Sequence, residues 1–260
     1  MKYVRAEVLG INRKNIYRIS KLESRDLLIK EEIIETHKDH PAYGHRRLGW
    51  HLKVNAKRIR RIMRKYGITV PRRRIKNNFC TKSVKHRKYP NLIQNLEITY
   101  ENQVWCSDTS RFIFHGQKWY IVTVLDIFTR QVLGVAIGRH HDSALVLEAI
   151  EMALVTSRTH PAIFHSDQGT EFMAEEITYF LEQLGTRISA SDKASPWQNG
   201  YQESFFGKFK LDVGDINRFK TPGELLEALY HGIYYYNNDR IHTALKMPPA
   251  VYAKQFLKKS

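Results

Sequence analysis

Three acidic residues, Asp108, Asp167 and Glu203, are the side chains of this 260-residue chain best suited to chemistry. Asp108 lies in an apolar run that predicts a strand, Asp167 follows a short buried strand, and Glu203 lies near the start of a predicted helix. Carboxylate oxygens from separate elements can converge on hard cations such as Mg²⁺. Two divalent ions about 3.5–4 Å apart can activate a nucleophile and stabilise a leaving 3′ oxygen. Spacing alone does not select this chemistry, so the surrounding sequence must decide.

The elements that would position these acids alternate along the second part of the chain. Three consecutive apolar runs predict an antiparallel meander, and later strands are separated by helices. The predicted strands cover 104–114, 118–128, 131–138, 162–166 and 186–190, and the predicted helices begin near Ser143, Ala174, Tyr201 and Pro222. This order predicts an α/β fold, a mixed five-stranded sheet with helices on its faces.

The positive charge of the chain belongs to its first part. The formal net charge is +16, and residues 1–100 hold 26 Lys and Arg against 8 Asp and Glu, whereas residues 101–260 hold 16 against 18. No acid lies between Asp39 and Glu97. Such a segment repels itself unless a polyanion neutralises it, which favours DNA first and an acidic membrane surface second.

Short helices are predicted within this basic part. One follows the N-cap candidate Ser24, a second carries Leu48 and Leu52, and a third covers 56–66 after the N-cap candidate Asn55. Residues 6–17 have the spacing of either a helix–turn–helix or an ordinary helical hairpin. The charged face of the third helix is either simply solvated or bound to DNA, and we expect DNA contacts from Lys57, Arg58, Arg60, Arg61 and Arg64, with Arg72, Arg73 and Arg74 after it.

Several classes of protein are excluded by composition. The chain has no run approaching the roughly 20 apolar residues of a membrane span, and its first residues lack an apolar signal-peptide stretch. Two cysteines, Cys80 and Cys106, cannot build a disulfide framework or a four-thiolate zinc site. We therefore expect a cytoplasmic protein, bound to no membrane, with reduced thiols.

The segments around the three acids resemble the catalytic-acid motifs of retroviral-integrase-like transposases, above all those of bacterial insertion sequences. Two further segments resemble the closing motif and the amino-terminal DNA-binding helices of that family, so that the resemblance covers nearly the whole chain. The segments are Val104-Trp-Cys-Ser-Asp108-Thr-Ser, His165-Ser-Asp167-Gln-Gly-Thr-Glu-Phe, Asn199-Gly-Tyr-Gln-Glu203-Ser-Phe-Phe-Gly-Lys-Phe-Lys210, Tyr236-Asn-Asn-Asp-Arg240-Ile-His242, and His40-Pro-Ala-Tyr43-Gly-His-Arg-Arg47 with the helix after Asn55.

The resemblance implies an RNase H-like catalytic core at 99–260 with a C-terminal helical extension. A helix–turn–helix-like, all-α DNA-binding region at 1–74 and a basic linker at 75–98 would precede it. It also implies that Asp108, Asp167 and Glu203 hold Mg²⁺ or Mn²⁺, as two ions, for 3′-end cleavage followed by strand transfer. Lys210, seven residues after Glu203, would share its helix face and hold substrate phosphate. Lys208 either contacts DNA or is solvated.

The partners implied are double-stranded DNA, both the terminal inverted repeats of an element and its target, and further copies of the chain in a synaptic complex. Such proteins are often fused to an upstream-frame helix–turn–helix and coiled-coil partner, and a place at the bacterial nucleoid would follow. A DNA-binding regulator or inhibitor of transposition, inactive without that partner, is the alternative, and a nuclease of the same fold is a third.

Other motif residues have competing interpretations. His165 either packs beside the fourth strand or assists the chemistry, and Trp197, Gln198 and Asn199 either contact DNA ends or shape a turn. Arg240 and His242 are expected to tie the last helix to the core. Leu211-Asp212 departs from the basic residue and Glu that often follow Lys210 in the family.

Overall fold

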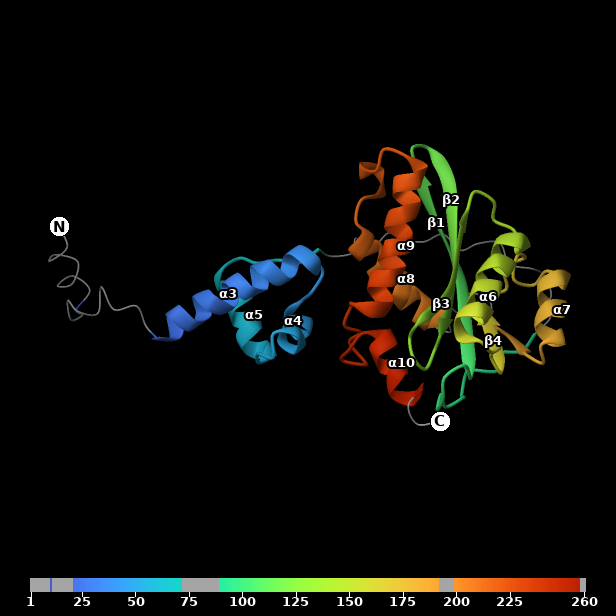
Figure 1. Cartoon of the computed structure of the whole chain (residues 1–260), viewed down its shortest axis with the longest axis horizontal. Helices are drawn as coiled ribbons and strands as arrows, with labels where there is room; N and C mark the ends of the chain where they lie inside the picture. Colours follow the sequence, from blue (N-terminus) through green and yellow to red (C-terminus); the bar gives the residue numbers. More distant parts are fainter. Residues whose placement is uncertain (1–9, 11–20, 72–88, 192–198, 258–260) are drawn as a thin grey trace. The chain divides into compact units, whose positions relative to one another are not determined.

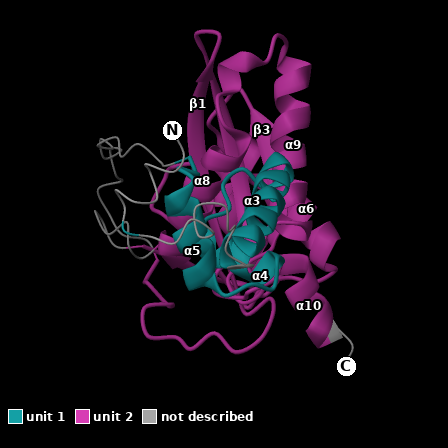
Figure 2. Cartoon of the chain, turned by 90° about the vertical axis from the view of Figure 1, so that its left-hand side faces the viewer, with its two compact units in different colours: residues 1–71 teal, residues 72–260 magenta. Residues whose placement is uncertain are grey.

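The computed structural model describes residues 10, 21–71, 89–191 and 199–257 of the chain (Figure 1). The chain divides into two compact units, residues 1–71 and residues 72–260 (Figure 2). No helix in the described ranges is long and apolar enough to cross a membrane. The candidate helix–turn–helix at 6–17 lies outside the described residues except for Gly10.

The first unit contains three described helices, α3 (Lys21–Asp39), α4 (His45–His51) and α5 (Ala56–Lys65). Asn55 caps α5 as expected, because its side-chain oxygen accepts the backbone N–H of Lys57 at 2.8 Å. The apolar stripe of α5 is buried against the other two helices, with Ile33, Leu48, Ile59 and Ile62 fully buried and Met63 nearly so. Burial of this stripe leaves the basic residues of α5 on its remaining surface.

The second unit is built on a five-stranded mixed sheet, as the sequence predicts. Its strands are β1 (Val104–Phe114), β2 (Gln117–Asp126), β3 (Val132–Gly138), β4 (Ile163–Ser166) and β5 (Arg187–Ala190). The order in the sheet is β3-β2-β1-β4-β5. The expected antiparallel meander is formed by β1, β2 and β3, whereas β4 pairs in parallel with both β1 and β5.

Helices cover both faces of this sheet (Figure 1). On one face lie α6 (Ser143–Ser157) and α7 (Glu175–Gln183), and on the other lie α8 (Gly200–Val213) and α9 (Pro222–Asn238). α6 lies very close to β3, since a Cβ added to Gly134 would be only 1.9 Å from the carbonyl oxygen of Ala149. Larger residues than glycine therefore do not fit at position 134.

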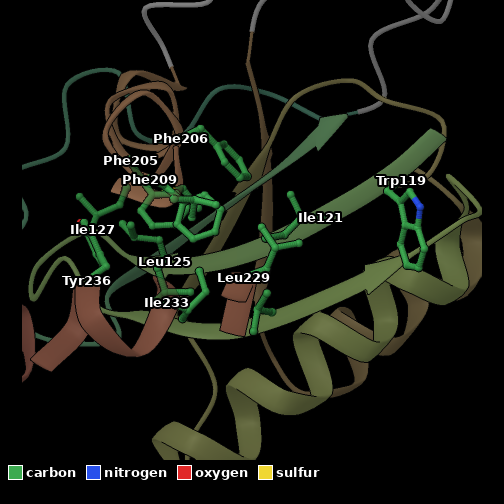
Figure 3. Packing of buried hydrophobic residues seen from close by; sticks show 14 of the residues in the cluster. Trp119, Ile121, Leu125, Ile127, Phe205, Phe206, Phe209, Leu229, Ile233 and Tyr236 are labelled. Atoms are coloured by element: carbon green, nitrogen blue, oxygen red, sulfur yellow. The ribbon is translucent and has the colours of Figure 1, made fainter. Parts of the chain in front are cut away.

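The core beneath α8 and α9 holds that helix pair on the strands that carry the candidate acids. Aromatic residues of α8 pack with those of α9, and the ring of Phe205 meets that of Tyr236 edge-on at 4.8 Å. Figure 3 shows residues of this cluster from α8, from α9 and from β2: Phe205, Phe206, Phe209, Leu229, Ile233, Tyr236, Ile121 and Leu125. Because this cluster fills the space between the helix pair and the sheet, α8 has little freedom to shift.

Two segments add to the elements expected from the sequence. The helix α10 (Pro249–Leu257) lies in the expected C-terminal helical extension, where the sequence pattern predicts no separate helix because paired prolines also suit a turn. It packs through Tyr252 and Phe256 against Phe128. Residues 89–98, within the expected linker, belong to the second unit and pack on its core, and the backbone N–H of Leu92 donates to Ser189 at 2.9 Å.

Candidate active site

Asp108 and Asp167 lie on neighbouring parallel strands at the same level. In the β1–β4 pairing, Val104 is opposite Ile163 and Cys106 is opposite His165. Extending that register by two residues brings Asp167, the first residue after β4, beside Asp108. Residues two apart on a strand share a face, so Asp108 lies on the face of Cys106, which packs in the core under α8. Two of the three acids are therefore neighbours.

Glu203 is brought to this face by α8, and the residue before it anchors the helix. The side chain of Gln202 is fully buried and donates to the carbonyl oxygens of Cys106 at 2.6 Å and Thr123 at 3.1 Å. Its own oxygen accepts the hydroxyl of Thr123 at 3.0 Å. These three hydrogen bonds join α8 to β1 and β2 at the level of Asp108, which pairs with Thr123. Gln202 thus fixes the rotation of the helix turn that carries Glu203.

The carboxyl of Asp108 has its pKa raised to about 7. Burial is the main cause, the charge of Asp167 raises the pKa further, and that of Glu203 adds to it. The backbone N–H of Thr109, 2.8 Å from Asp108 Oδ1, and the charge of Lys210 act in the opposite direction. Asp167, Glu203 and Lys210 therefore lie close enough to Asp108 for their charges to shift its pKa.

The loop after β4 holds a further acid beside Asp167. Burial raises the pKa of Asp167, and its Oδ1 accepts the backbone N–H of Gly169 at 3.0 Å. Glu171, which is nearly buried, pairs with His141 at 2.7 Å. A Cβ on Gly169 would be 2.7 Å from the Glu171 carboxylate oxygens, so glycine permits their close approach. The sequence motif contains Glu171 but carries no signal for this contact with His141.

The three acids fit divalent metal ions by the chemistry of their donors, although they do not form a closed ligand set. Among the described residues, no three His, Cys, Asp or Glu side chains converge closely enough to hold a metal ion. Asp108 and Asp167 are held by the sheet, whereas Glu203 is exposed on the first turn of α8. Burial and acidic neighbours raise the pKa of Asp108, and burial raises that of Asp167, so a cation would stabilise both ionised carboxylates. Hard oxygen ligands suit Mg²⁺ or Mn²⁺.

The two lysines of α8 lie on different sides of the helix. Lys210 is exposed, and its Nζ is 5.9 Å from the centroid of the Phe206 ring. Its charge reaches Asp108, as expected for a residue two turns after Glu203. Lys208 donates to the hydroxyl of Ser204 at 2.8 Å. Whether either lysine contacts DNA stays a prediction.

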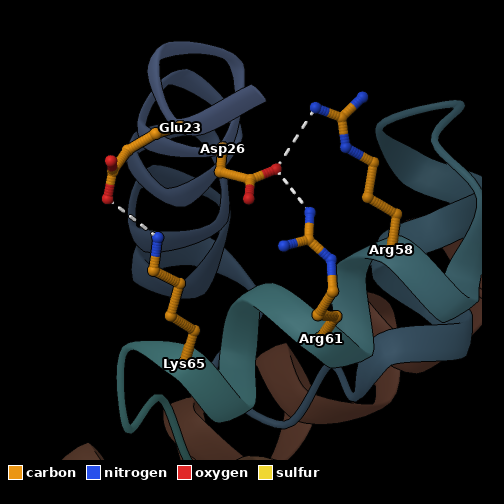
Figure 4. A network of polar contacts seen from close by, with 5 residues as sticks. All are labelled: Glu23, Asp26, Arg58, Arg61 and Lys65. Carbon is orange, nitrogen blue, oxygen red and sulfur yellow. Dashed lines mark hydrogen bonds and ion pairs between the residues drawn. The ribbon is translucent and has the colours of Figure 1, made fainter. Parts of the chain in front are cut away.

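Two of the expected DNA-binding arginines have partners inside the first unit (Figure 4). Arg61 and Arg58 donate to the same carboxylate oxygen of Asp26 at 2.7 and 3.3 Å, and Asp26 is 1% exposed. Burial alone would raise the pKa of Asp26, but hydrogen bonds from both arginines outweigh it and lower the pKa. Sequence spacing did not reveal this, because Asp26 lies 32 and 35 residues from the two arginines.

The other expected basic residues divide into two groups. On α5, Lys57, Arg60 and Arg64 are exposed and follow one another at the spacing of a single helix face. They remain candidates for phosphate contact. The three consecutive arginines Arg72, Arg73 and Arg74 lie outside the described residues, as do Trp197 and Gln198.

The remaining motif residues are bound within the fold. Both ring nitrogens of the buried His165 contact serine hydroxyls of neighbouring segments, Ser189 at 2.9 Å and Ser191 at 3.0 Å, which agrees with packing. Arg240 is 2% exposed and donates from Nε to Asp212 at the end of α8. The residue that departs from the family pattern is thus the partner of the closing-motif arginine, which ties the end of α9 to α8.

Comparison with known proteins gives a family context to this geometry. Residues 99–196 and residues 184–249 match two family models, each described as an integrase core domain. The putative transposase of insertion sequence IS150 from Escherichia coli K12 is 27% identical over 245 residues, which cover 87% of this chain and 83% of that protein. The transposase of IS904 from Lactococcus lactis is 26% identical over 197 residues, 75% of this chain and 78% of that protein.

A solved structure shares the fold at low sequence identity. In the cryo-EM structure of the simian T-cell lymphotropic virus intasome with the PP2A regulatory subunit B56γ, one chain is 14% identical to this one, with a TM-score of 0.50. The match covers 84% of this chain and 73% of that chain. Since the two integrase core models together span the sheet and α8, where the acids lie, and the relatives match over both units, the chain belongs to the integrase superfamily as an insertion-sequence transposase, a polynucleotidyl transferase with an RNase H-like core.

Proposed function

We propose that this transposase cuts the ends of its insertion sequence and joins them to target DNA at a single centre formed by Asp108, Asp167 and Glu203. The observation that carries the assignment is the raised pKa of Asp108, to about 7, caused by burial and by the charges of the other two acids. A carboxylate whose ionised form is destabilised in the fold does not add to stability, and is therefore a candidate for function.

The three carboxylates would hold two Mg²⁺ or Mn²⁺ ions together with oxygens of the DNA phosphate. Bound there, such ions would activate the attacking oxygen and stabilise the leaving 3′ oxygen. The protein would position these groups. The paired strands β1 and β4 would fix two acids, Gln202 would hold the third on α8, and Lys210 would lie near the phosphate.

Both steps are phosphoryl transfers that conserve the number of bonds to phosphorus. In cleavage, a water oxygen bonds to the phosphorus at the element end, the bond from phosphorus to the 3′ oxygen breaks, and that oxygen takes a proton. In strand transfer, the freed 3′ hydroxyl bonds to a target phosphorus, and the target strand loses its own 3′ oxygen as a hydroxyl. No covalent protein intermediate and no external energy source are required.

DNA would be held by basic residues of both units. Lys57, Arg60 and Arg64 present charge on α5, and Lys208 and Lys210 present it on α8. We infer that the active form is an oligomer, since two element ends must be brought together and a solved intasome shares the fold. Terminal inverted repeats, an upstream-frame fusion partner and a place at the nucleoid in the cytoplasm belong to the same proposal.

The test uses labelled duplexes that carry the DNA flanking this gene, with full-length protein and Mg²⁺ or Mn²⁺. Asp167→Asn and Glu203→Gln are compared with Glu176→Gln, an exposed carboxylate of α7. We expect wild type and Glu176→Gln to give cleaved and joined products, and both active-site variants to bind DNA without giving either product.

Two outcomes would overturn the proposal. Cleavage that survives in both active-site variants would exclude these acids as the centre. DNA binding with no chemistry in the wild-type chain, under either metal, would favour a regulator that needs an upstream partner for activity.

A further inference from the structure

A cavity of about 640 Å³ opens on the second unit beside the N-terminal half of α8. Its walls come from α8, from the turn between β2 and β3, and from the segment after α9. The polar residues that line it are Arg130, Tyr201, Ser204, Lys208, His242 and Thr243. It is distinct from the centre formed by the acids, because neither Glu203 nor the two aspartates line it.

The cavity and the acids use different faces of one helix. Tyr201, Ser204 and Lys208 are spaced at i, i+3 and i+7, which gives one stripe along α8. Glu203 and Lys210 form a second stripe, about 140° around the helix. DNA that crosses the N-terminal end of α8 could contact both stripes.

Arg130 carries hydrogen-bond donors in this cavity that have no acceptor among the described residues. Its guanidinium carbon lies 4.2 Å from the centroid of the Tyr201 ring. Its Nε and Nη1 are shielded from solvent and have no hydrogen-bond partner within the described part of the chain. Asp126, four residues earlier, does not serve as the partner, since its oxygens accept from Asn102 and Thr129. Shielded cationic donors without acceptors are costly and point to a missing anion.

The backbone at Arg130 supports a role for its side chain. Its φ of 64° lies in the left-handed region, which glycine and asparagine adopt more readily than arginine. A turn that needed only this conformation would be served better by glycine. Strained residues of this kind collect at sites that bind ligands.

The charge of the cavity defines the class of ligand. Its lining contains two cationic side chains, Arg130 and Lys208, and one histidine, but no Asp or Glu. Along the helix axis, Lys208 lies five residues or about 7.5 Å from Glu203. That is about two nucleotide steps along DNA, at 3.4 Å per step.

We propose that this cavity binds the phosphodiester backbone of a DNA strand next to the cleavage centre, with Arg130 as the main contact and Lys208 as the second. The inference rests on the proposed function, because it assumes DNA over the first turns of α8. The ring of Tyr201 holds the guanidinium in place, and the hydroxyl of Ser204 lines the same cavity as a further donor to phosphate.

The experiment measures how DNA affinity depends on salt, using the full-length chain. The probe is a fluorescein-labelled duplex of about 30 base pairs taken from the flanking DNA. Its fluorescence anisotropy reports binding as the KCl concentration is raised. Arg130→Gln is compared with Arg130→Lys and with Arg158→Gln. Arg158 is a matched control, since it is exposed, also has a left-handed backbone (φ 58°) and lies at the end of α6, on the opposite face of the sheet.

We expect Arg130→Gln to bind about fivefold more weakly at moderate salt and to lower the slope of log K against log[KCl] by about 0.9, the value for one phosphate contact. Arg130→Lys should restore the slope, and Arg158→Gln should match wild type. An unchanged slope in Arg130→Gln, with only a lowered melting temperature, would mean that Arg130 merely supports Tyr201 and would overturn the proposal.

A second variant keeps the inference testable if Arg130→Gln fails to fold. Lys208→Gln removes the other cation and should lower the same slope by a similar amount, so a wild-type slope in Lys208→Gln would also overturn the proposal. Failure of the proposed function has a different signature, because it appears as cleavage that persists in Glu203→Gln. The salt slope measures binding and does not depend on that result.

Discussion

The carboxylate of Asp26 in the first unit is buried and that of Asp108 in the second is partly buried, yet the charges around them differ in sign. Asp26 accepts hydrogen bonds from Arg58 and Arg61, and its pKa is lowered (Figure 4). Asp108 lies beside Asp167 and near Glu203, and its pKa is raised to about 7. Burial acts in the same direction on both, so the neighbouring charges determine the outcome.

We infer that this difference separates a structural carboxylate, Asp26, from the proposed metal ligand Asp108. A buried acid that already has cationic partners contributes to the fold and has little left to offer a ligand. A buried acid whose neighbours are also acids destabilises the free protein and gains most when a cation arrives. The predictions below test that division.

Asp108→Asn should have the largest effect. Loss of one carboxylate from a metal-dependent phosphoryl-transfer centre removes several kcal/mol of transition-state stabilisation, so cleavage should fall by at least about 1000-fold. The measurement is single-turnover cleavage of the labelled duplex in Mg²⁺. Activity within about tenfold of wild type would remove Asp108 from the centre.

The same variant should be more stable than wild type when metal is withheld. Because the native pKa of Asp108 is above its unfolded value, ionisation costs stability as pH rises through the window from about 4 to about 7. At pH 8 in EDTA, Asp108→Asn should therefore melt a few degrees higher, and at pH 4 the gain should disappear. A lower melting temperature at pH 8 would contradict the comparison.

Gln202→Met should lower the rate while leaving DNA affinity unchanged. The change leaves two buried carbonyl oxygens and the Thr123 hydroxyl without their partner, and it loosens the turn that carries Glu203. We expect about a 10- to 100-fold loss of kcat, as for other residues that orient metal ligands. Thr123→Val, which removes one of the three hydrogen bonds, is the graded control and should have a smaller effect.

Asp26→Asn should loosen the first unit without changing the chemistry of the second. The two arginines would lose their shared acceptor, and the amides of α3 and α5 should exchange with solvent about tenfold faster. Hydrogen exchange on the full chain measures both units together. Equal acceleration in β1 and β4 would mean that the network is not local to the first unit.

The stability of the first unit should fall at acid pH, whereas ionisation of Asp108 lowers stability as pH rises. A lowered native pKa gives stability that is present above the unfolded value near 3.8 and is lost as pH falls through the native pKa. Protection of α3 and α5 should therefore hold from pH 7 to about 5 and decline below 4. Asp26→Asn should lack this decline.

Substitutions at the neighbouring residues Arg60 and Arg61 should have the smallest effects, and the two effects should differ in kind. Arg60→Gln, on the exposed face of α5, should weaken DNA binding a few-fold and lower the salt slope by about 1. Arg61→Gln should mainly accelerate amide exchange in α3, because this arginine pairs with Asp26. Equal loss of DNA affinity in both variants would show that pairing with Asp26 does not withdraw Arg61 from DNA.

Much of the fold could be predicted from patterns local in the sequence. Apolar runs placed the five strands and the helices over residues 21–238 to within a few residues, because each element carries its own signals. The expected cap Ser24 is wrong, since it lies inside α3. The prolines before α10 concealed a helix start. Proline suits the first turn of a helix, so position 249 was as consistent with a helix as with a break.

Only those site residues that lie in recognisable motifs could be predicted from the sequence. Asp108, Asp167 and Glu203 lie in recognisable segments, but what surrounds them depends on contacts distant in sequence. The Asp26 pairing spans more than 30 residues, and Gln202 reaches strands 79 and 96 residues earlier. The available signal is that Gln202 lies three and four residues before Phe205 and Phe206, on the apolar stripe of α8, because a buried amide requires partners.

The parallel pairing of β4 with β1 has a consequence for how the protein is made. The meander of β1, β2 and β3 pairs segments that are close in the chain, whereas β4 and α8 must close loops of roughly 50 residues or more to reach β1, and such contacts form late. We therefore expect the meander to fold first. A ribosome-bound chain that has exposed only that meander carries Asp108 alone, and one that ends before position 203 lacks the third acid. On the proposed function, the centre of three acids would therefore be complete only after nearly the whole core has been synthesised.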